Sequence, residues 1–235
     1  MIILKRKERD IKMNKFSKRA ALSYGWTEVK NNFSFILGLA GILLIYSIIF
    51  YFLTEIPGLV GVGFEIIRII VGFIIGLGII RISLNVYDET DFGYSELLNQ
   101  KHLLLSVIGT TVIFTGLILP FAILGTFSII LFFSTSPLIA ILLLIVSFVA
   151  ALTIATILYF ADYSIVDKQL GPIKAIKESI RITKGSRLNL FIFLLTLVVL
   201  NLLGLMLLGI GLFITLPLSF LAEAYVYCQL SKQAE

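Results

Sequence analysis

Long apolar stretches separated by short polar ones dominate this chain, and they predict an all-α integral membrane bundle. A helix needs about 20 mostly apolar residues to cross the roughly 30 Å hydrocarbon core of a bilayer. Stretches of that kind predict six spans near residues 33–53, 64–82, 103–133, 138–160, 188–208 and 212–230. An alternative with five spans places the 64–82 stretch in the membrane interface, because it contains glycines and the charged residues Glu65 and Arg68.

Turn-forming residues separate these stretches. The chain breaks at Pro57-Gly58, and again at residues 134–137, which end in a proline. The last apolar stretch, 188–230, is too long for one helix, and Gly209 and Gly211 divide it into a fifth and a sixth span. We therefore expect three hairpins whose turns lie on the same side of the membrane.

Basic residues favour one orientation of this bundle. Nine of the 19 lysines and arginines precede Phe33, and the segment between the fourth and fifth spans, 162–187, is also rich in them. The three turns at 54–63, 134–137 and 209–211 contain no lysine or arginine. Since basic loops stay in the cytoplasm, we expect a cell-membrane protein with both termini cytoplasmic.

Composition leads to the same class of protein. Hydrophobic residues make up 59% of the chain and charged residues only 14%, whereas a soluble domain has about a quarter charged residues. The net charge of +5 comes largely from the N-terminal cluster beside the first span, which indicates attraction to anionic lipid rather than to nucleic acid. We therefore divide the chain into a basic N-terminal segment with an amphipathic helix, 1–32, and one transmembrane domain, 33–235.

The two basic segments are also similar to each other. Alignment of Lys30 with Lys184 pairs Ala21 with Ala175, in each case shortly before a long apolar run. A weaker third copy covers residues 94–101. We therefore consider a pseudo-repeat of three units, each an amphipathic interfacial helix followed by a helical hairpin, with boundaries near residues 86 and 162. The alternative is that any cytoplasmic loop entering a span tends to be amphipathic.

The last third of the chain contains a motif that resembles a known family. The motif consists of residues 167–179, DKQLGPIKAIKES, together with Thr183-Lys184-Gly185 and the glycines of 201–212. It resembles an uncharacterised prokaryotic multi-pass membrane protein family that looks like the membrane domain of some glycerophosphodiester phosphodiesterases. The resemblance implies a multi-helix membrane domain. It does not imply phosphodiesterase activity, because no part of this chain matches the soluble catalytic barrel.

Three charged residues inside predicted spans are candidates for a polar site, because charges in a membrane are costly and are usually functional. Glu65 and Arg68 lie three residues apart and can pair on one helical face. Glu223 lies in the last span between two alanines. The structural alternative places all three near the interfaces, where they reach the headgroups.

Basic residues of the second cytoplasmic segment are candidate contacts to lipid headgroups, and they are Lys174, Lys177, Arg181, Lys184 and Arg187. In the same segment, Ile173, Ile176 and Ile180 recur at helical spacing, which predicts a helix that lies in the interface. Aromatic residues near the expected cytoplasmic boundary, including Tyr163 and Tyr227, are interpreted as anchors of membrane depth.

These residues predict a non-enzymatic membrane protein, without a cofactor or a bound metal, that organises anionic lipid or a membrane protein partner. The alternative is a transporter or permease for small solutes or lipid, which requires Glu65, Arg68 and Glu223 to meet at one cavity. A third possibility is a lipid-modifying enzyme, which requires His102, Asp162 and Asp167 to lie within reach of one another.

Overall fold

The computed structural model describes residues 16–134, 137–207 and 209–234, and this part of the chain forms helices and no strand. The helices are α2 (Lys18–Asn31), α3 (Phe33–Thr54), α4 (Leu59–Tyr87), α5 (Glu96–Asn99), the 3-10 helix η1 (Gln100–Leu103), α6 (Leu104–Ser134), α7 (Pro137–Leu158), α8 (Ala161–Lys168), α9 (Pro172–Thr183), α10 (Arg187–Met206) and α11 (Leu212–Ala234). Within the described residues, the helices α3, α4, α6, α7, α10 and α11 are long and apolar enough to cross a membrane. The chain is therefore an all-α, multi-pass membrane protein.

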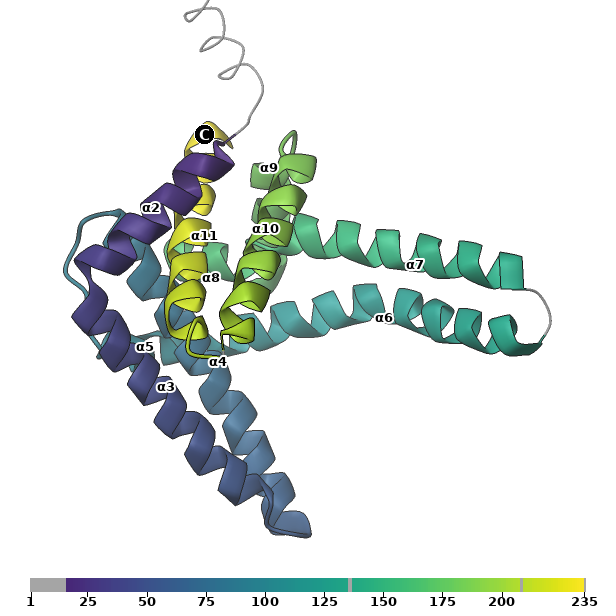
Figure 1. Ribbon diagram of the computed structural model, residues 1–235, viewed down its shortest axis with the longest axis horizontal. Coiled ribbons are helices and arrows are strands. Elements are labelled where there is room, and N and C mark those ends of the chain that lie inside the picture. The colour runs from purple at the N-terminus through teal and green to yellow at the C-terminus, as the bar shows by residue number, and fades with distance from the viewer. Residues whose placement is uncertain (1–15, 135–136, 208, 235) are drawn as a thin grey trace, which may run out of the picture.

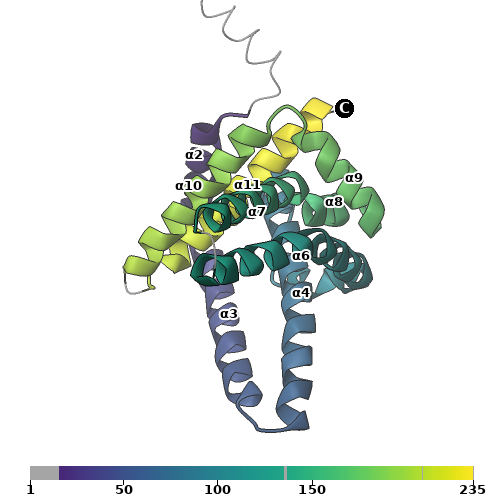
Figure 2. The ribbon, with the colours of Figure 1, turned by 90° about the vertical axis from the view of Figure 1, so that its right-hand side faces the viewer.

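The six long helices pair into three hairpins, and two of these extend away from a common hub (Figure 1). We use the word hub for α2, α8 and α9 together with the parts of α4, α10 and α11 that pack against them. The α3/α4 and α6/α7 hairpins extend away from the hub in different directions, as the second view also shows (Figure 2). The α10/α11 hairpin belongs to the hub itself, so the other two hairpins expose apolar flanks along much of their length.

A shorter helical segment precedes each hairpin. Helix α2 leads into α3/α4, α5 and η1 lead into α6/α7, and α8 and α9 lead into α10/α11. This order has the form that the three-unit hypothesis describes. The short helix α8 lies in a segment that the sequence indicated only as part of a basic loop.

The six expected spans are confirmed as helices, with one clear change in length. Helix α4 runs from Leu59 to Tyr87, whereas the sequence predicted residues 64–82. Glycines 61 and 63 were interpreted as part of the turn, but they lie inside the helix. A side-chain carbon on Gly61 would collide with the carbonyl of Ile56, so the absence of a side chain lets the chain turn back directly into α4.

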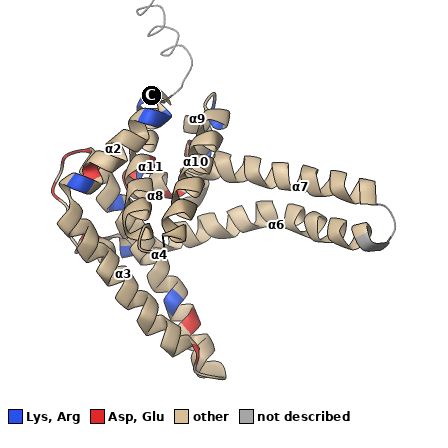
Figure 3. Ribbon diagram, in the orientation of Figure 1, with Lys and Arg blue, Asp and Glu red and all other residues tan. Residues whose placement is uncertain are grey.

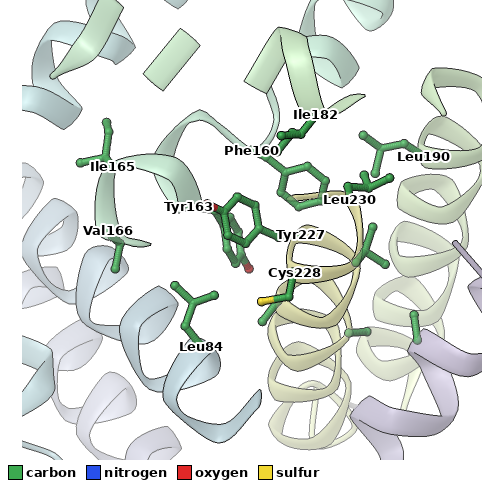
Figure 4. Packing of buried hydrophobic residues seen from close by; sticks show 14 of the residues in the cluster. Leu84, Phe160, Tyr163, Ile165, Val166, Ile182, Leu190, Tyr227, Cys228 and Leu230 are labelled. Carbon is green, nitrogen blue, oxygen red and sulfur yellow. The ribbon is translucent and has the colours of Figure 1, made fainter. Parts of the chain in front are cut away.

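Large side chains and very small ones both build the hub. Phe160, Tyr163 and Tyr227 are almost fully buried and pack ring against ring between α8 and α11 (Figure 4). Helix α2 approaches α11 closely because Gly25 faces Leu218 and Ala222. The short helix α8 is therefore held in the core and is not a surface element.

Charged residues are distributed unevenly over these elements (Figure 3). Helices α6 and α7 contain none in their described parts, and α3 contains none. One exposed pair, Glu65 and Arg68, lies in the half of α4 that points away from the hub. The other charges of the described chain lie in the hub, in α5 and η1 and in the loops, and Glu55 lies at the turn between α3 and α4.

Candidate functional site

A cavity of about 520 Å³ lies beside the hub, between α4, α6, α8 and α11. Its polar lining comes from Tyr159, Asp162, Tyr163 and Glu223. The rest of the wall is apolar and is formed by Ile69, Gly72, Phe73, Gly76, Leu77, Ile79, Ile80, Val107 and Phe220. A volume of this size is in the range of small-molecule sites.

Glu223 is the most deeply placed charged group of this cavity, with 8% of its surface exposed. The hydroxyl of Tyr163 donates a hydrogen bond to Oε2 of Glu223 over 3.1 Å, and Tyr159 interacts with the same carboxylate. No lysine, arginine or histidine among the described residues lines the cavity. Hydroxyl groups therefore satisfy this buried carboxylate, and a basic side chain does not.

Asp162 brings a second carboxylate to the same cavity. It lies in the first turn of α8, one residue before Tyr163. Its carboxylate makes no hydrogen bond or ion pair with another residue in the described parts of the chain. Two acidic groups and two phenol groups therefore face one space, and one of the acidic groups has no protein partner.

Glu65 and Arg68 do not join Glu223. They pair with each other on α4, with Nε of Arg68 2.8 Å from Oε2 of Glu65, and both side chains are more than 40% exposed. Tyr46 of α3 donates a hydrogen bond of 2.6 Å to the Arg68 carbonyl and ties the two helices together at this level. The pair is absent from the cavity wall, so the three candidate residues form two separate features.

Helix α9 presents the basic residues of the second cytoplasmic segment. Its inner face is sealed by Ala175, Ser179 and Ile182, which are at most 1% exposed. Its outer face carries Lys174 and Lys177 beside Ile173 and Ile180, which are 61% and 39% exposed. Two of the isoleucines of the predicted interfacial helix, Ile173 and Ile180, therefore point away from the protein core, and Ile176 is partly buried.

Three of the charged residues around α9 form an ion network. Lys168 and Arg181 both donate to the Glu178 carboxylate over 2.8 Å. The hydrogen bonds from Arg181, and then those from Lys168, hold the pKa of Glu178 below its usual value. Arg181 also donates to the carbonyl of Ala234 over 3.2 Å, which joins α9 to the end of α11.

Basic residues from distant parts of the sequence gather at one end of the hub. The Asn189 amide donates to the carbonyl of Phe16 over 2.9 Å, so the residues just before α2 lie against the first turn of α10. Lys18, Lys184 and Arg187 are therefore brought to one side of the molecule, where α11 also ends (Figure 1). We use the name basic rim for Lys18, Lys184 and Arg187 at this end of the hub, together with the exposed Lys174 and Lys177 of α9 and Arg19 of α2.

An apolar groove of about 260 Å³ lies between the first and third hairpins. Leu39, Leu43 and Phe35 line it from α3, and Phe213 and Phe220 line it from α11. Asn32 contributes a polar group at the end where α2 meets α3. The groove has the apolar lining that a hydrocarbon chain requires.

His102, Asp162 and Asp167 each have a different environment. Nε2 of His102 lies 2.8 Å from Oε1 of Gln169, and the other ring nitrogen faces the Asn99 carbonyl. Asp167 accepts a hydrogen bond of 2.7 Å from Tyr227, whereas Asp162 lines the cavity. In the described parts of the chain, no three His, Cys, Asp or Glu side chains are close enough to hold a metal ion.

Two tyrosines at and near the candidate site were interpreted wrongly from the sequence. Tyr163 and Tyr227 were expected to anchor membrane depth, but they are 4% and 1% exposed and bind carboxylates through their hydroxyls. One available signal was the spacing of Tyr159 and Tyr163, which puts both phenols on one helical face when the chain is helical there.

Comparisons of the chain with protein-family models, with curated proteins and with solved structures found no match. The resemblance to the phosphodiesterase membrane domain therefore depends only on the residues given above. The fold is that of a multi-pass helical membrane protein.

Proposed function

We propose that this membrane protein is a non-enzymatic organiser of anionic lipid, with headgroups at the basic rim and hydrocarbon chains between the hairpins. The observation that carries the proposal is the outer face of α9. Lys174 and Lys177 have no ion-pair partner among the described residues, and they alternate with exposed Ile173 and Ile180. A helix of this kind suits the boundary between acyl chains and anionic headgroups.

Helix α2 supports the same placement. Trp26 of α2 is 46% exposed, and Nζ of Lys30 lies 4.8 Å from the centre of its ring. Tryptophan and lysine side chains are typical of the membrane interface, where one part is apolar and the other is hydrated. Helices α2 and α9 would then lie at one membrane surface, which we propose to be the cytoplasmic surface of the cell membrane.

The divergence of the hairpins supports the proposal that acyl chains lie between them. Hairpins that separate from a hub leave spaces walled by leucine, isoleucine and phenylalanine side chains, and in a bilayer lipid fills such spaces. The groove between α3 and α11 is one such space, and Asn32 lines it where α2 meets α3. We propose that it holds one acyl chain of a lipid whose headgroup lies at the hub.

The decisive experiment measures which lipids stay bound to the purified protein. The protein is purified in detergent, supplied with equal amounts of phosphatidylglycerol and phosphatidylcholine, and analysed by native mass spectrometry. We expect preferential retention of phosphatidylglycerol, and a loss of that preference in the Lys174→Gln/Lys177→Gln variant. The Lys174→Arg/Lys177→Arg variant keeps the charge and should keep the preference. Equal retention of the two lipids by the wild-type protein contradicts the proposal.

A matched pair of variants tests the groove. Leu43→Trp places a large side chain in the groove, whereas Leu37→Trp lies on the same helix at an exposed position that does not line it. We expect Leu43→Trp alone to reduce the number of retained lipids. An equal effect of the two tryptophans would show that the groove holds no lipid.

Transport remains the second proposal, and the cavity at Glu223 is the observation that favours it. Glu65 and Arg68 no longer contribute to it, because they pair with each other away from the cavity. Uptake into proteoliposomes that is lost in Glu223→Gln and retained in Glu65→Gln/Arg68→Gln would support transport. A membrane protein partner is a further proposal, for which the exposed flanks of α6 and α7 offer a surface.

A further inference from the structure

We infer that the cavity beside Glu223 is a binding site for an organic cation of the substituted-ammonium class. The inference is independent of the lipid proposal, because the cavity shares no residue with α9 or with the basic rim. Its support comes from the charge of the lining, the kind of side chains in the wall, and the size of the space.

The charged groups that line the cavity in the described chain are all acidic. Asp162 and Glu223 are the carboxylates that face the cavity, Tyr159 and Tyr163 are its other titratable groups, and no basic side chain in the described chain lines it. A carboxylate buried in an apolar membrane domain without a counter-charge is costly, and residues of this kind commonly mark a ligand path. A bound cation supplies the charge that the protein does not.

Aromatic rings make up much of the wall. Phe73 comes from α4, Phe220 from α11, and Tyr159 and Tyr163 from the end of α7 and from α8. The faces of such rings attract a cation within about 6 Å, and quaternary ammonium groups are bound in this way in aromatic cages. Carboxylates and rings together therefore suit an alkylated or arylalkyl ammonium ion better than an anion.

The size of the cavity excludes a bare metal ion as its natural occupant. A space of about 520 Å³ accommodates a molecule of several heavy atoms, and no three potential metal ligands of the described chain lie together. Ile69 of α4 and Tyr159, in the turn between α7 and α8, line the cavity and are also 47% and 37% exposed, so they mark its mouth between α4 and that turn. The ligand enters from that side with its apolar part against α4.

Binding of benzyltrimethylammonium to the purified protein, measured by isothermal titration calorimetry, tests the inference. We expect binding to the wild-type protein and an affinity lower by about tenfold or more in Asp162→Asn, since a charge-assisted contact is worth about 1.5 to 3 kcal/mol. Glu223→Gln should lower it further. Glu89→Gln removes an exposed loop carboxylate and should leave the affinity unchanged. Uncharged benzyl alcohol should bind equally weakly to all four proteins.

A steric variant keeps the test valid if Glu223→Gln fails to fold. Gly76 lines the cavity, and a side-chain carbon added to it meets no atom within 4 Å, so Gly76→Leu fills the space without a backbone collision. Gly41 is equally open but lies outside the cavity, so Gly41→Leu is its control. Loss of binding in Gly76→Leu alone supports the site. Absence of wild-type binding at millimolar concentration, or equal affinity in Asp162→Asn and wild type, overturns it.

Discussion

The hydroxyl of Tyr227 donates a hydrogen bond of 2.7 Å to Oδ2 of Asp167, and this bond joins the last helix to a short helix sixty residues earlier. The Tyr227 ring is 1% exposed, whereas Asp167 is exposed. The bond therefore orients a core side chain toward the solvated edge of α8. It also explains why the Tyr227 hydroxyl is present in a cluster built mainly from apolar groups.

Tyr227→Phe should lower the free energy of unfolding by about 1 kcal/mol, because Asp167 loses a donor but can be hydrated instead. Thermal unfolding in detergent measures the change. Tyr51→Phe is the control, because Tyr51 is 63% exposed on α3 and should be insensitive to the loss of its hydroxyl. A destabilisation of the same size in both variants would contradict the structural role of the bond.

Gly25→Ala should destabilise the contact between α2 and α11. A side-chain carbon at this position would lie 2.6 Å from the Leu218 carbonyl oxygen, which is backbone and cannot rotate away. Overpacking of this kind costs about 1 to 3 kcal/mol. Gly41→Ala, with no atom within 4 Å, should instead be neutral or stabilising by up to about 1 kcal/mol. Chemical denaturation of the two purified variants distinguishes these outcomes.

Local features of this fold could be predicted from the sequence. Pro57-Gly58 and Gly209-Ile210-Gly211 end helices through their own backbone geometry, and both breaks are present. The pairing of Glu65 with Arg68 follows from a spacing of three residues on a helix, and it is also present. None of these features depends on where other helices lie.

The environment of Glu223 could not be predicted in the same way. Glu223 could be singled out from the sequence because a charge inside a span is costly. Its partner Tyr163, however, is sixty positions away in the sequence. That contact requires α8 to fold as a separate short helix within the hub, inside a segment whose charges indicated a basic loop. The environment of Glu223 therefore depends on tertiary packing, which the hydropathy of the sequence does not report.

The ion network at Glu178 should make stability depend on pH below neutrality. Hydrogen bonds from Arg181 and Lys168 lower the pKa of Glu178 from 4.5 in the folded protein. The native state then binds the proton less readily than the unfolded state, so stability is fully present above about pH 4.5 and is lost as the pH falls through the lowered pKa. We expect a contribution of about 1 kcal/mol, since Arg181 is half exposed.

Unfolding of wild type and Glu178→Gln over the range from about pH 7 to about pH 3 measures this contribution. The stability difference between them should shrink as the pH falls, because the wild-type carboxylate is then protonated and resembles the amide. A difference that stays constant with pH would show that Glu178 contributes through packing and not through its charge.

Removal of one member of the Glu65–Arg68 pair should be worse than removal of both. Each single replacement leaves a charge unbalanced on an apolar helix, where membrane insertion disfavours it. Glu65→Leu and Arg68→Leu should each reduce the amount of inserted protein, and Glu65→Leu/Arg68→Leu should restore it. Quantification of membrane-integrated protein for the four sequences gives a double-mutant cycle. Strictly additive losses would mean that the two residues act independently and that each has its own partner in the membrane.

Cysteine labelling tests the orientation that the basic residues predict. Cys228 is the only cysteine and is buried, so Cys228→Ala provides a background for Leu59→Cys at the turn of the first hairpin and for Lys184→Cys at the basic rim. Leu59 is 90% exposed and Lys184 is exposed, so both positions are accessible to a reagent on their side of the membrane. Since basic segments stay in the cytoplasm, a membrane-impermeant maleimide should label Leu59→Cys in intact cells and Lys184→Cys only after permeabilisation. The reverse pattern would place α9 outside the cell, and the lipids at the basic rim would then be those of the outer leaflet.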